Sequence, residues 1–444
     1  MLVITLGIGA MIHFYGIYIE ENNKGDTVKD TKQIVAMVID TSGNYVSLAA
    51  RLASEYKRMY YCIPSWVDAY PSPNKTLIGE GIDGLIVVKN PYDVYDEIDL
   101  WIFPDVYYGA FGEWLKAQGE IVWGSCAAEE LEIYRDILRE EMPKLGLPVA
   151  KWVKINGMTA LREYLQKNKK VWVKVNEWRG LIETFYSKNY DLVKPELDDI
   201  EFCRGILAER IDFICEEPIE TDREMGYDGY TVDGEYPAEW LSGLEVKDKV
   251  YLGQWRKYSD LPSALTDFNT KFAKEFNGYG YRGFFSLENR IAGKKSYMTD
   301  FTARMPCPPG SIYLAMIENL GEVMWAGANG EIVPGKPVAQ YGVELMMESN
   351  WAEKHICNIY FPKEIKQFVQ LKKYAIEDGI TQIIPIANGS NDIGSIVGLG
   401  KSAEEAIENV KKYAEQVEGT EISVRVDCLD GAAELLTEFQ EQSN

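Results

Sequence analysis

Residues 34–124 alternate between short apolar runs and segments with helical patterning, and this alternation restricts the fold more than any other feature. A β-branched run at 34–39 ends in the turn DTSGN, and the helical pattern YVSLAARLASEYK and the strand-like run RMYYCIP follow. A strand, a glycine-containing turn and a helix form a Rossmann-type opening. Strands that alternate with helices predict a parallel sheet covered on both faces. The other elements expected in this part are strands at 85–88, 99–103 and 120–124 and a helix at 109–118.

The rest of the chain predicts a mixture of helices and strands without internal repeats. An amphipathic helix is expected at 126–145, ended by Gly146, and a helix that starts at Ser402 has Glu405 at the third position of a capping box. Further strands are expected at 149–155, 170–175, 181–187, 212–220, 341–347, 382–387 and 393–400, and helices at 158–168, 195–209 and 263–276.

These patterns predict a multidomain protein that combines α/β and α+β architecture. The expected divisions are an apolar extension with a polar loop at 1–33, a Rossmann-like domain at 34–125, a central domain at 126–335 and a smaller α+β domain at 336–444. Residues 1–19 are almost wholly apolar but lack a basic start and a cleavage site, so we expect short strands or an extra edge strand there instead of a signal peptide or membrane anchor.

Composition narrows the classes of function. The net charge of −23 and the pI near 4.7 argue against nucleic-acid binding and against anionic membranes. Seven cysteines without a CxxC pair indicate reduced thiols and a cytoplasmic location. Only His13 and His355 are present, which nearly excludes histidine-based zinc sites and catalytic triads. Carboxylates, lysines, arginines and backbone amides remain, the groups that handle nucleotide phosphates.

The segment 283–304, GFFSLENRIAGKKSYMTDFTAR, predicts a β-hairpin with an unusual acidic face. With a five-residue loop, Ile291 would face Tyr297 and Glu288 would lie directly opposite Asp300. Two carboxylates in this position repel unless a cation lies between them. Oxygen ligands without histidine suit Mg²⁺, which also takes oxygens from phosphates.

Alternation places Ser286, Thr302 and Arg304 on the same face of this hairpin as the two acids. Arg304 is then positioned to hold a phosphate beside the metal. The alternative is a solvated hairpin with ordinary surface charges.

Three upstream features could complete a nucleotide site. Lys174 lies within the apolar run VWVKV and either contacts phosphate or reaches solvent from an edge strand. Arg135 and Arg139 lie one helical turn apart on the same face of a predicted helix. They either belong to a solvated face or provide further positive charge for the same phosphates. The run Glu216-Glu217-Pro218-Ile219 ends a strand at a proline. Free backbone groups there could bind the edge of an adenine ring, and acids beyond the proline could bind the ribose hydroxyls.

The order of these features resembles the ATP-grasp superfamily and is most similar within it to phosphoribosylamine–glycine ligase. The similarity covers about residues 34–425 and is clearest in WGSCAAEELEIYRDILREEMPKLGLPVAKW, KVWVKV, ICEEPIE, YMTDFTARMPCPPG and IVGLGKSAEEAIENVKKYAEQV. The resemblance implies ATP and Mg²⁺, or Mn²⁺, as cofactors and small-molecule carboxylate and amine substrates. It leaves the oligomeric state open.

The resemblance also implies roles for individual residues. Those expected to act on the transferred phosphate are Lys174 and Arg304. Those expected to bind the nucleotide are Arg135, Lys174, Arg179, Glu216, Glu217, Ile219 and Glu224. Those expected to bind the metal are Glu288, Asp300 and Thr302.

Four departures from the family pattern accompany these roles. Thr302 stands where the family has asparagine, and the glycine-rich flexible loop is reduced to 176–180. The Gly-Gly-Arg-Glu-type loop of the glycine ligase is replaced by 41–44, and its Gly-Met-Gly substrate segment is missing, with 243–260 in that region. The sequence therefore supports two hypotheses. One is an ATP-dependent carboxylate–amine ligase that acts through an acyl phosphate. The other is a degenerate ATP-grasp scaffold that binds a nucleotide or partner without catalysis. A Rossmann oxidoreductase is disfavoured because Gly43 stands alone without a GxGxxG motif.

Overall fold

A computed structural model describes residues 30–64, 72–177, 184–221, 224–246, 250–292, 295–386 and 390–429. The apolar segment 1–19 lies outside them, so its assignment to strands stays a prediction. Within the described part of the chain, no helix is both long and apolar enough to cross a membrane. All seven cysteines are free of disulfide bonds in the structure.

The N-terminal part contains the predicted parallel sheet. Its five strands follow the order β3-β2-β1-β4-β5, and every neighbouring pair is parallel. Alternate residues of β1 belong to two different hydrophobic cores, so both faces are buried. Both expected helices form, and 3-10 turns at 73–77 and 91–97 flank β3. The elements are β1 Val35–Ile39, α1 Val46–Leu52, β2 Arg58–Cys62, β3 Leu85–Val87, β4 Leu100–Ile102, α2 Gly109–Ala117 and β5 Val122–Trp123.

The prediction of a single helix at 126–145 is wrong. The segment forms a 3-10 turn at Cys126–Glu129, α3 at Glu130–Ile133 and α4 at Arg135–Lys144. The break falls at Tyr134, whose φ of −104° and ψ of 86° are not helical. Neither glycine nor proline marks this position, so the sequence carried no local signal for it. The break sets the direction in which α4 presents Arg135 and Arg139.

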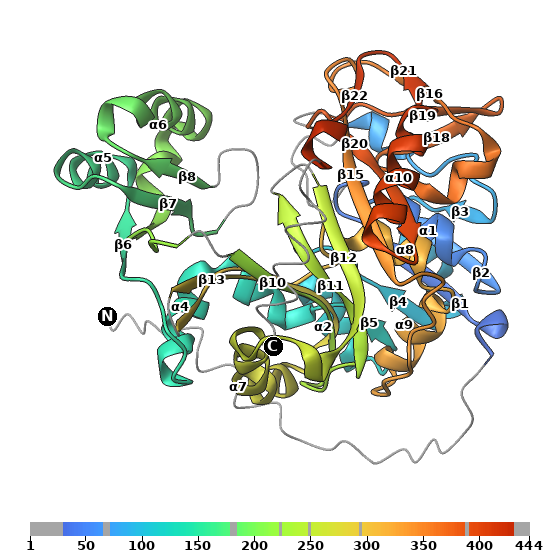
Figure 1. Ribbon diagram of the computed structural model, residues 1–444, viewed down its shortest axis with the longest axis horizontal. Helices are drawn as coiled ribbons and strands as arrows, with labels where there is room; N and C mark the ends of the chain where they lie inside the picture. Colours follow the sequence, from blue (N-terminus) through green and yellow to red (C-terminus); the bar gives the residue numbers. More distant parts are fainter. Residues whose placement is uncertain are drawn as a thin grey trace, which may run out of the picture.

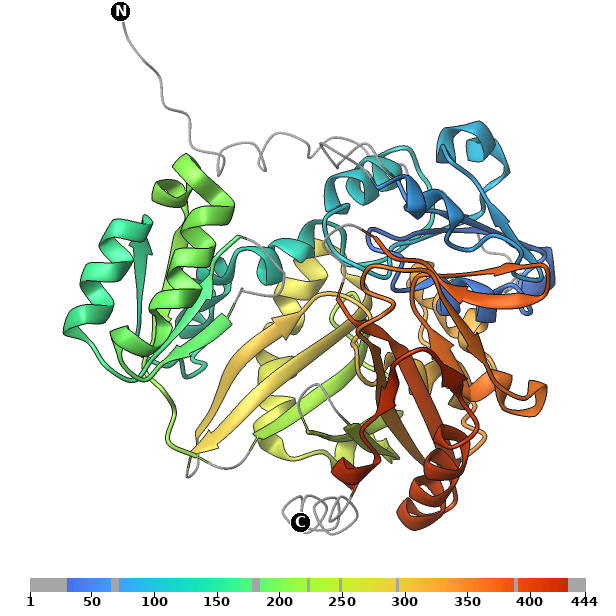
Figure 2. The same ribbon diagram turned by 90° about the horizontal axis from the view of Figure 1, so that it is seen from above.

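A small lobe stands apart from the rest of the molecule in both ribbon views (Figures 1 and 2). It has its own hydrophobic core and an antiparallel sheet in the order β6-β9-β7-β8. The expected helix at 195–209 begins earlier and ends in a 3-10 turn at 205–210. The elements are β6 Trp152–Asn156, α5 Met158–Lys167, β7 Val171–Val175, β8 Thr184–Ser187, α6 Tyr190–Arg204 and β9 Asp212–Glu216. Because β7 is an inner strand, the edge-strand interpretation of Lys174 is wrong.

The predicted hairpin forms β13 Arg282–Ala292 and β14 Lys295–Thr302, with β10 Glu224–Val232 beside β13. Its other face packs on α7 Ser263–Tyr279 within an aromatic core. Glu288 does lie opposite Asp300, as predicted. The register near the loop is wrong, however, because Ile291 faces Ser296 and the loop is shorter than five residues.

A β-bulge at Thr299 reconciles these two registers. The pairing shifts between Glu288 and Asn289, which leaves Thr299 as the extra residue of β14. Bulges redirect side chains and backbone groups and are frequent near functional sites. The bulge here restores the pairing of the two acids and turns the Thr299 carbonyl toward the small lobe.

The C-terminal part shares a sheet with the centre of the chain. This sheet runs β11-β12-β15-β20-β17, with β22 beside β15. The hairpin β11 Glu239–Val246 and β12 Val250–Lys257 was not predicted as strands, and it joins β15 across residue 335. The boundary expected at 335 therefore divides strands of one sheet. The N-cap of α10 is confirmed, since the Glu405 amide donates to Ser402 Oγ (3.2 Å).

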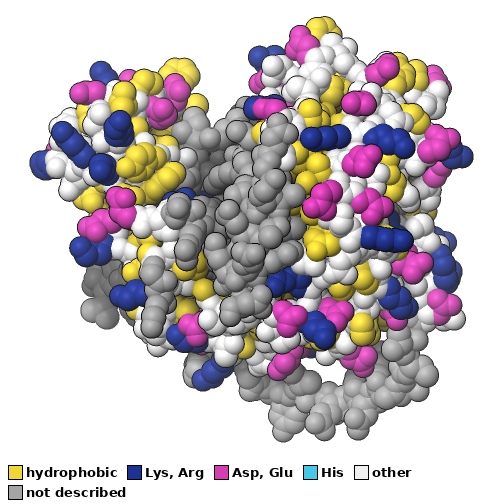
Figure 3. Space-filling view, viewed as in Figure 1, with side chains coloured by type: hydrophobic (Ala, Val, Ile, Leu, Met, Phe, Trp, Pro, Cys, Tyr) yellow, Lys and Arg dark blue, Asp and Glu magenta, His cyan; other side chains and the backbone are white. Residues whose placement is uncertain are grey.

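The remaining elements cover this sheet and form a smaller one beside it. The second sheet has the order β18-β19-β16-β21, and the strand expected at 382–387 overlaps β19 only at 382–383. The elements are α8 Gly310–Met316, α9 Leu320–Ala328, β15 Tyr341–Ser349, β16 Cys357–Tyr360, β17 Val369–Leu371, β18 Tyr374–Glu377, β19 Ile380–Ile383, β20 Asp392–Gly400, α10 Ala403–Ala414, β21 Glu418–Gly419 and β22 Ile422–Val424. On the described part of the face in Figure 3, acidic and basic side chains are interspersed, without a continuous basic patch.

Candidate functional site

The acidic face of the hairpin holds two carboxylates in register. Glu288 and Asp300 are directly opposed, and the Thr299 hydroxyl donates to Glu288 Oε1 (3.0 Å). Asp300 Oδ1 lies 3.9 Å from Arg135 Nε, and 37% of the Asp300 side chain is exposed. Protein cations thus offset part of the repulsion between the acids, while Asp300 stays open to a ligand.

Lys174 contacts the bulge from across the lobe boundary. Its Nζ donates to the Thr299 carbonyl (2.6 Å), and Arg139 Nη2 donates to the same oxygen (3.4 Å). Lys174 and Arg139 are both buried, so the solvated-face interpretation is wrong for Arg139. The bulge therefore gathers cations from β7 and α4 at the edge of the acidic face.

Glu216, at the end of β9, completes a buried charge cluster. Its carboxylate accepts a hydrogen bond from Arg139 Nε, and its Oε2 lies 3.5 Å from Lys174 Nζ. Burial alone would raise the pKa of Glu216, but the charges of Lys174 and Arg139 outweigh burial and lower it. Glu216 is consequently ionised and holds both cations in place.

Arg135 lies deepest in the cluster, with 2% of its surface exposed. Its Nη1 donates to the Val175 carbonyl (2.6 Å), and its own carbonyl accepts from Arg139 Nη1 (3.0 Å). The solvated-face interpretation is therefore wrong for Arg135 as well. Arg135 therefore joins α4 to β7 and also lies close to Asp300.

The hinge beyond β9 is more exposed to solvent than the charge cluster. Glu217 is exposed and pairs with Lys151 (3.4 Å), while Ile219 is half-buried. Arg179 and the side chain of Glu224 lie outside the described residues. The roles of these four residues in nucleotide binding remain predictions.

Arg304 lies beyond the end of β14, and its contacts connect the hairpin to the N-terminal sheet. Its Nε donates to Glu132 Oε1 (3.1 Å) and lies 3.7 Å from Asp105 Oδ1. Asp105 in turn accepts from the Thr41 hydroxyl (2.9 Å). Burial lowers the pKa of Arg304, but Glu132, Tyr45 and Asp105 outweigh it, so the pKa is raised well above its usual range and the charge persists.

The turn after β1 is shaped by a buried acid that the sequence interpretation missed. Asp40 accepts from the amides of Ser42 (3.0 Å), Gly43 (2.9 Å) and Tyr45 (2.8 Å). Gly43 has a φ of +79°, which favours glycine. The turn DTSGN is therefore a rigid loop that ends beside Arg304.

The donor set fits a hard divalent cation only in part. Glu288 and Asp300 supply carboxylates, and Thr302 supplies a hydroxyl on the same face. Among the described residues, no group of three or more His, Cys, Asp or Glu is arranged to hold a metal. Mg²⁺ commonly uses one or two carboxylates with substrate phosphates and water. The residues present therefore fit Mg²⁺ when a nucleotide provides the other oxygens.

Other site residues were also missed. Glu132, Asp105 and Thr299 lie in a helix, a loop and a bulge that are far apart in the sequence. The signal that could have indicated Glu132 was its position within a helix already singled out for its arginines. The bulge had no such signal, since it follows from a register that only the assembled sheet defines.

The comparisons with known proteins concern the fold. No family model and no curated protein matches the chain. Phosphoribosylamine–glycine ligase from Thermotoga maritima is 16% identical with a TM-score of 0.65, and the match covers 89% of this chain and all 100% of that one.

Two further solved structures agree. The biotin carboxylase domain of 2-oxoglutarate carboxylase from Hydrogenobacter thermophilus, solved with MgADP, ADP and bicarbonate, is 12% identical over 92% of this chain and 98% of that one (TM-score 0.63). N5-carboxyaminoimidazole ribonucleotide synthetase from Thermus thermophilus is 12% identical over 86% of this chain and 98% of that one (TM-score 0.55). The chain has the α/β multidomain fold of ATP-grasp ligases, as the sequence predicted.

Proposed function

We propose that the protein is an ATP-dependent carboxylate–amine ligase with a phosphoribosylamine–glycine ligase-like fold. The observation that carries the proposal is the opposed pair Glu288 and Asp300, which the bulge at Thr299 sets beside the buried cations. Solved proteins of this fold include enzymes named as ligases and carboxylases, and one of them holds MgADP. These similarities support the reaction class and leave the substrates open.

In the proposed reaction, an oxygen of the substrate carboxylate attacks the γ-phosphorus of ATP and the bond to ADP breaks. The resulting acyl phosphate is attacked by an amine, which loses a proton, and inorganic phosphate leaves. Lys174 and Arg135 would hold phosphate oxygens, and Arg304 would neutralise charge on the transferred group. Glu217, Ile219, Glu224 and Arg179 would bind the nucleoside end. No side-chain nucleophile is required.

Glu288, Asp300 and the Thr302 hydroxyl would hold Mg²⁺, or Mn²⁺, which when bound supplies positive charge to the phosphates. The protein's own residues would contribute by orienting the substrates and by stabilising the charge of the transition state. The reduced thiols support a cytoplasmic location.

One observation favours a second function, a nucleotide-binding scaffold without catalysis. Lys174 and Arg139 are held by Glu216 and by the Thr299 carbonyl. A phosphate must therefore displace contacts that the protein already makes. Measurable ATP binding without turnover for any acid and amine pair would establish this alternative.

ADP release with Mg²⁺ and a panel of acids and amines tests the ligase proposal. Asp300→Asn should reduce release at least about 100-fold, because the metal's charge contributes several kcal/mol to the transition state. Asp83→Asn, an exposed acid in the N-terminal domain, is the matched control and should leave release unchanged. Equal turnover by both variants would contradict a metal-binding role for the hairpin.

A further inference from the structure

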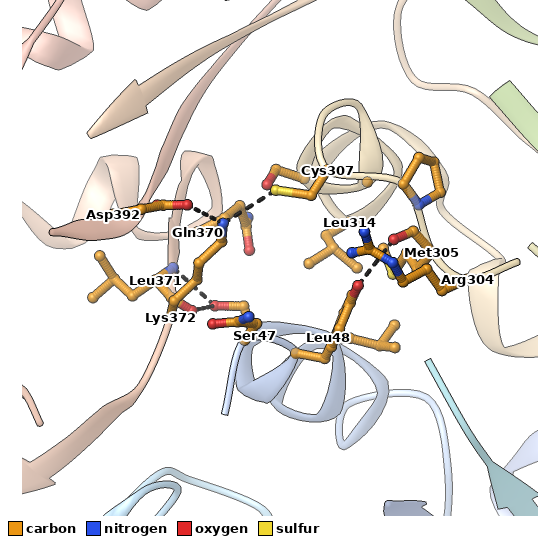
Figure 4. A pocket seen from close by; sticks show the side chains of 15 residues that line it. Ser47, Leu48, Arg304, Met305, Cys307, Leu314, Gln370, Leu371, Lys372 and Asp392 are labelled. Atoms are coloured by element: carbon orange, nitrogen blue, oxygen red, sulfur yellow. Dashed lines mark hydrogen bonds and ion pairs between the residues drawn. The ribbon is translucent and has the colours of Figure 1, made fainter. Parts of the chain in front are cut away.

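A cavity of about 230 Å³ is lined in part by Arg304. Its wall combines the start of α1, the segment from Arg304 to α8, and the end of β17 with the start of β20 (Figure 4). The volume is below the roughly 300–1,000 Å³ of pockets for drug-sized ligands. It therefore suits a small metabolite and is too small for a nucleotide.

One end of the cavity offers charges of both signs. Lys372 Nζ donates to Asp392 Oδ2 (2.5 Å) and lies 3.1 Å from Cys307 Sγ. Asp392 Oδ1 accepts from the Gly394 amide (3.0 Å), which fixes its carboxylate. Lys372 is 14% and Asp392 28% exposed at the side chain, so both can be reached from the cavity. Burial lowers the pKa of Lys372, but Cys307 and Asp392 outweigh burial and raise it, so the ammonium stays charged.

The other end is formed by the guanidinium of Arg304, which also pairs with Glu132 and Asp105. Figure 4 shows the Arg304 guanidinium and Lys372 on different sides of the cavity, with Leu314 between them. Arg304 Nε lies 3.1 Å from Glu132 Oε1 and 3.7 Å from Asp105 Oδ1. The Arg304 side chain also lines the cavity, where a ligand carboxylate would bind its terminal nitrogens.

The hydroxyl of Ser47 does not contribute to recognition. It donates to the Leu371 carbonyl (2.7 Å) and accepts from the Leu371 amide (2.9 Å). Ser47 therefore joins α1 to β17 and holds the two walls of the cavity together. Between its two charged ends the cavity is lined by apolar side chains and by polar ones that include Asn44, Ser311 and Gln370.

We infer that the cavity binds an α-amino acid that carries a second carboxylate, an aspartate- or glutamate-like acid. The α-carboxylate binds Lys372 and the α-ammonium binds Asp392, while the side-chain carboxylate lies at Arg304. A plain dicarboxylate would leave Asp392 without a cationic ligand group, and a neutral amino acid would leave Arg304 without a ligand carboxylate. This inference rests on the proposed function, in which the side-chain carboxylate oxygen at Arg304 forms the bond to the γ-phosphorus as the bond to ADP breaks.

Binding to the native full-length protein without nucleotide tests the inference. Calorimetry is run with L-glutamate, L-aspartate, glutarate and L-glutamine. The better of the two acidic amino acids should bind at least about 10-fold more tightly than glutarate or L-glutamine, since each comparison removes one charge-assisted contact. Equal binding of glutarate, equal binding of L-glutamine, or no binding of either acidic amino acid would overturn the inference.

Two variants assign the contacts. Lys372→Met and Asp392→Asn should each lower the affinity for the acidic amino acid at least about 10-fold. Lys354→Met, on the exposed surface, should leave that affinity unchanged. Unchanged affinity in both cavity variants would overturn the assignment. If either variant fails to fold, as judged by circular dichroism, the ligand series on the native protein still decides the inference.

The binding and turnover measurements separate this inference from the proposed function. Acidic amino-acid binding without ADP release under any condition would retain the cavity assignment and remove the ligase proposal. ADP release with another acid, in a protein that binds no acidic amino acid, would do the opposite.

Discussion

The charge cluster around Glu216 and the cavity beside Arg304 use the same kinds of side chains in different ways. In the cluster, Lys174 and Arg139 are almost fully buried and are held by an ionised acid and a backbone carbonyl. In the cavity, Lys372 and Asp392 are partly open. The cluster is consequently a rigid support whose cations are already engaged, whereas the cavity has capacity left for a ligand.

This difference suggests that the cluster mainly stabilises the fold and that the cavity mainly binds ligand. A buried ion cluster is costly to break because removing one member leaves charges without partners. An ion pair on a cavity wall costs less to rearrange, so it can exchange contacts with a substrate. Substitutions in the cluster should therefore affect stability first, and substitutions at the cavity should affect binding first.

The largest expected effect is at Glu216. Glu216→Gln leaves Lys174 and Arg139 buried without a carboxylate, and the unfolding free energy should fall by about 3–5 kcal/mol. Glu217→Gln, the exposed neighbour, should change it by less than about 0.5 kcal/mol. Urea denaturation of both variants measures the difference. Similar stability of the two would mean that the cluster is not the support described here.

A buried acid without a cation sharpens the comparison. Asp228 is in register with Ser286 on the hairpin sheet and accepts from Ser286 Oγ (2.7 Å) and Tyr251 Oη (2.9 Å). Burial raises its pKa to about 6, despite these two hydroxyls. The folded state therefore binds a proton more tightly than the unfolded state does, opposite to Glu216.

Stability should fall as the pH rises from about 4 to about 6 through this group. The pKa difference corresponds to about 3 kcal/mol, and Asp228→Asn should remove this component. Denaturation at a series of pH values measures it. The same pH slope in the variant and the native protein would show that Asp228 is ionised throughout.

Lys174 tests whether the cluster also binds phosphates. Lys174→Met should weaken ATP binding about 10- to 100-fold, in line with one charge-assisted hydrogen bond. Lys151→Met, an exposed lysine that pairs with Glu217, should weaken it far less. Calorimetry with ATP and Mg²⁺ measures both. ATP affinity that is insensitive to Lys174 would favour a purely structural cluster.

Ser47 should give the smallest effect. Ser47→Ala removes two hydrogen bonds to Leu371 and should reduce the unfolding free energy by about 1–2 kcal/mol. Ser72→Ala, whose hydroxyl makes no capping bond, is the control. Thermal denaturation compares the two. An effect no larger than that of the control would mean that α1 and β17 are held together by other contacts.

Much of the fold followed from local patterns. The alternation after residue 34 predicted the parallel sheet, and the acids at 288 and 300 were paired correctly. The helix at 126–145 and the hairpin at 239–257 were misjudged, because the break at Tyr134 and the pairing of β12 with β15 come from contacts between distant elements. The pairing of Ile291 was wrong because a bulge adds one residue without a sequence signal.

By itself, the sequence determined which residue types could do chemistry and on which elements they lie. Few histidines, scattered cysteines, the strand lysine and the acidic hairpin indicated phosphate and metal chemistry, and the resemblance to the ATP-grasp superfamily implied the reaction class that we propose. Only the tertiary structure decided which charges are already neutralised by the protein and which face a cavity. Periodicity reports the face of an element on which a side chain lies. The distance to a charge on another element depends on how the lobes and sheets pack together.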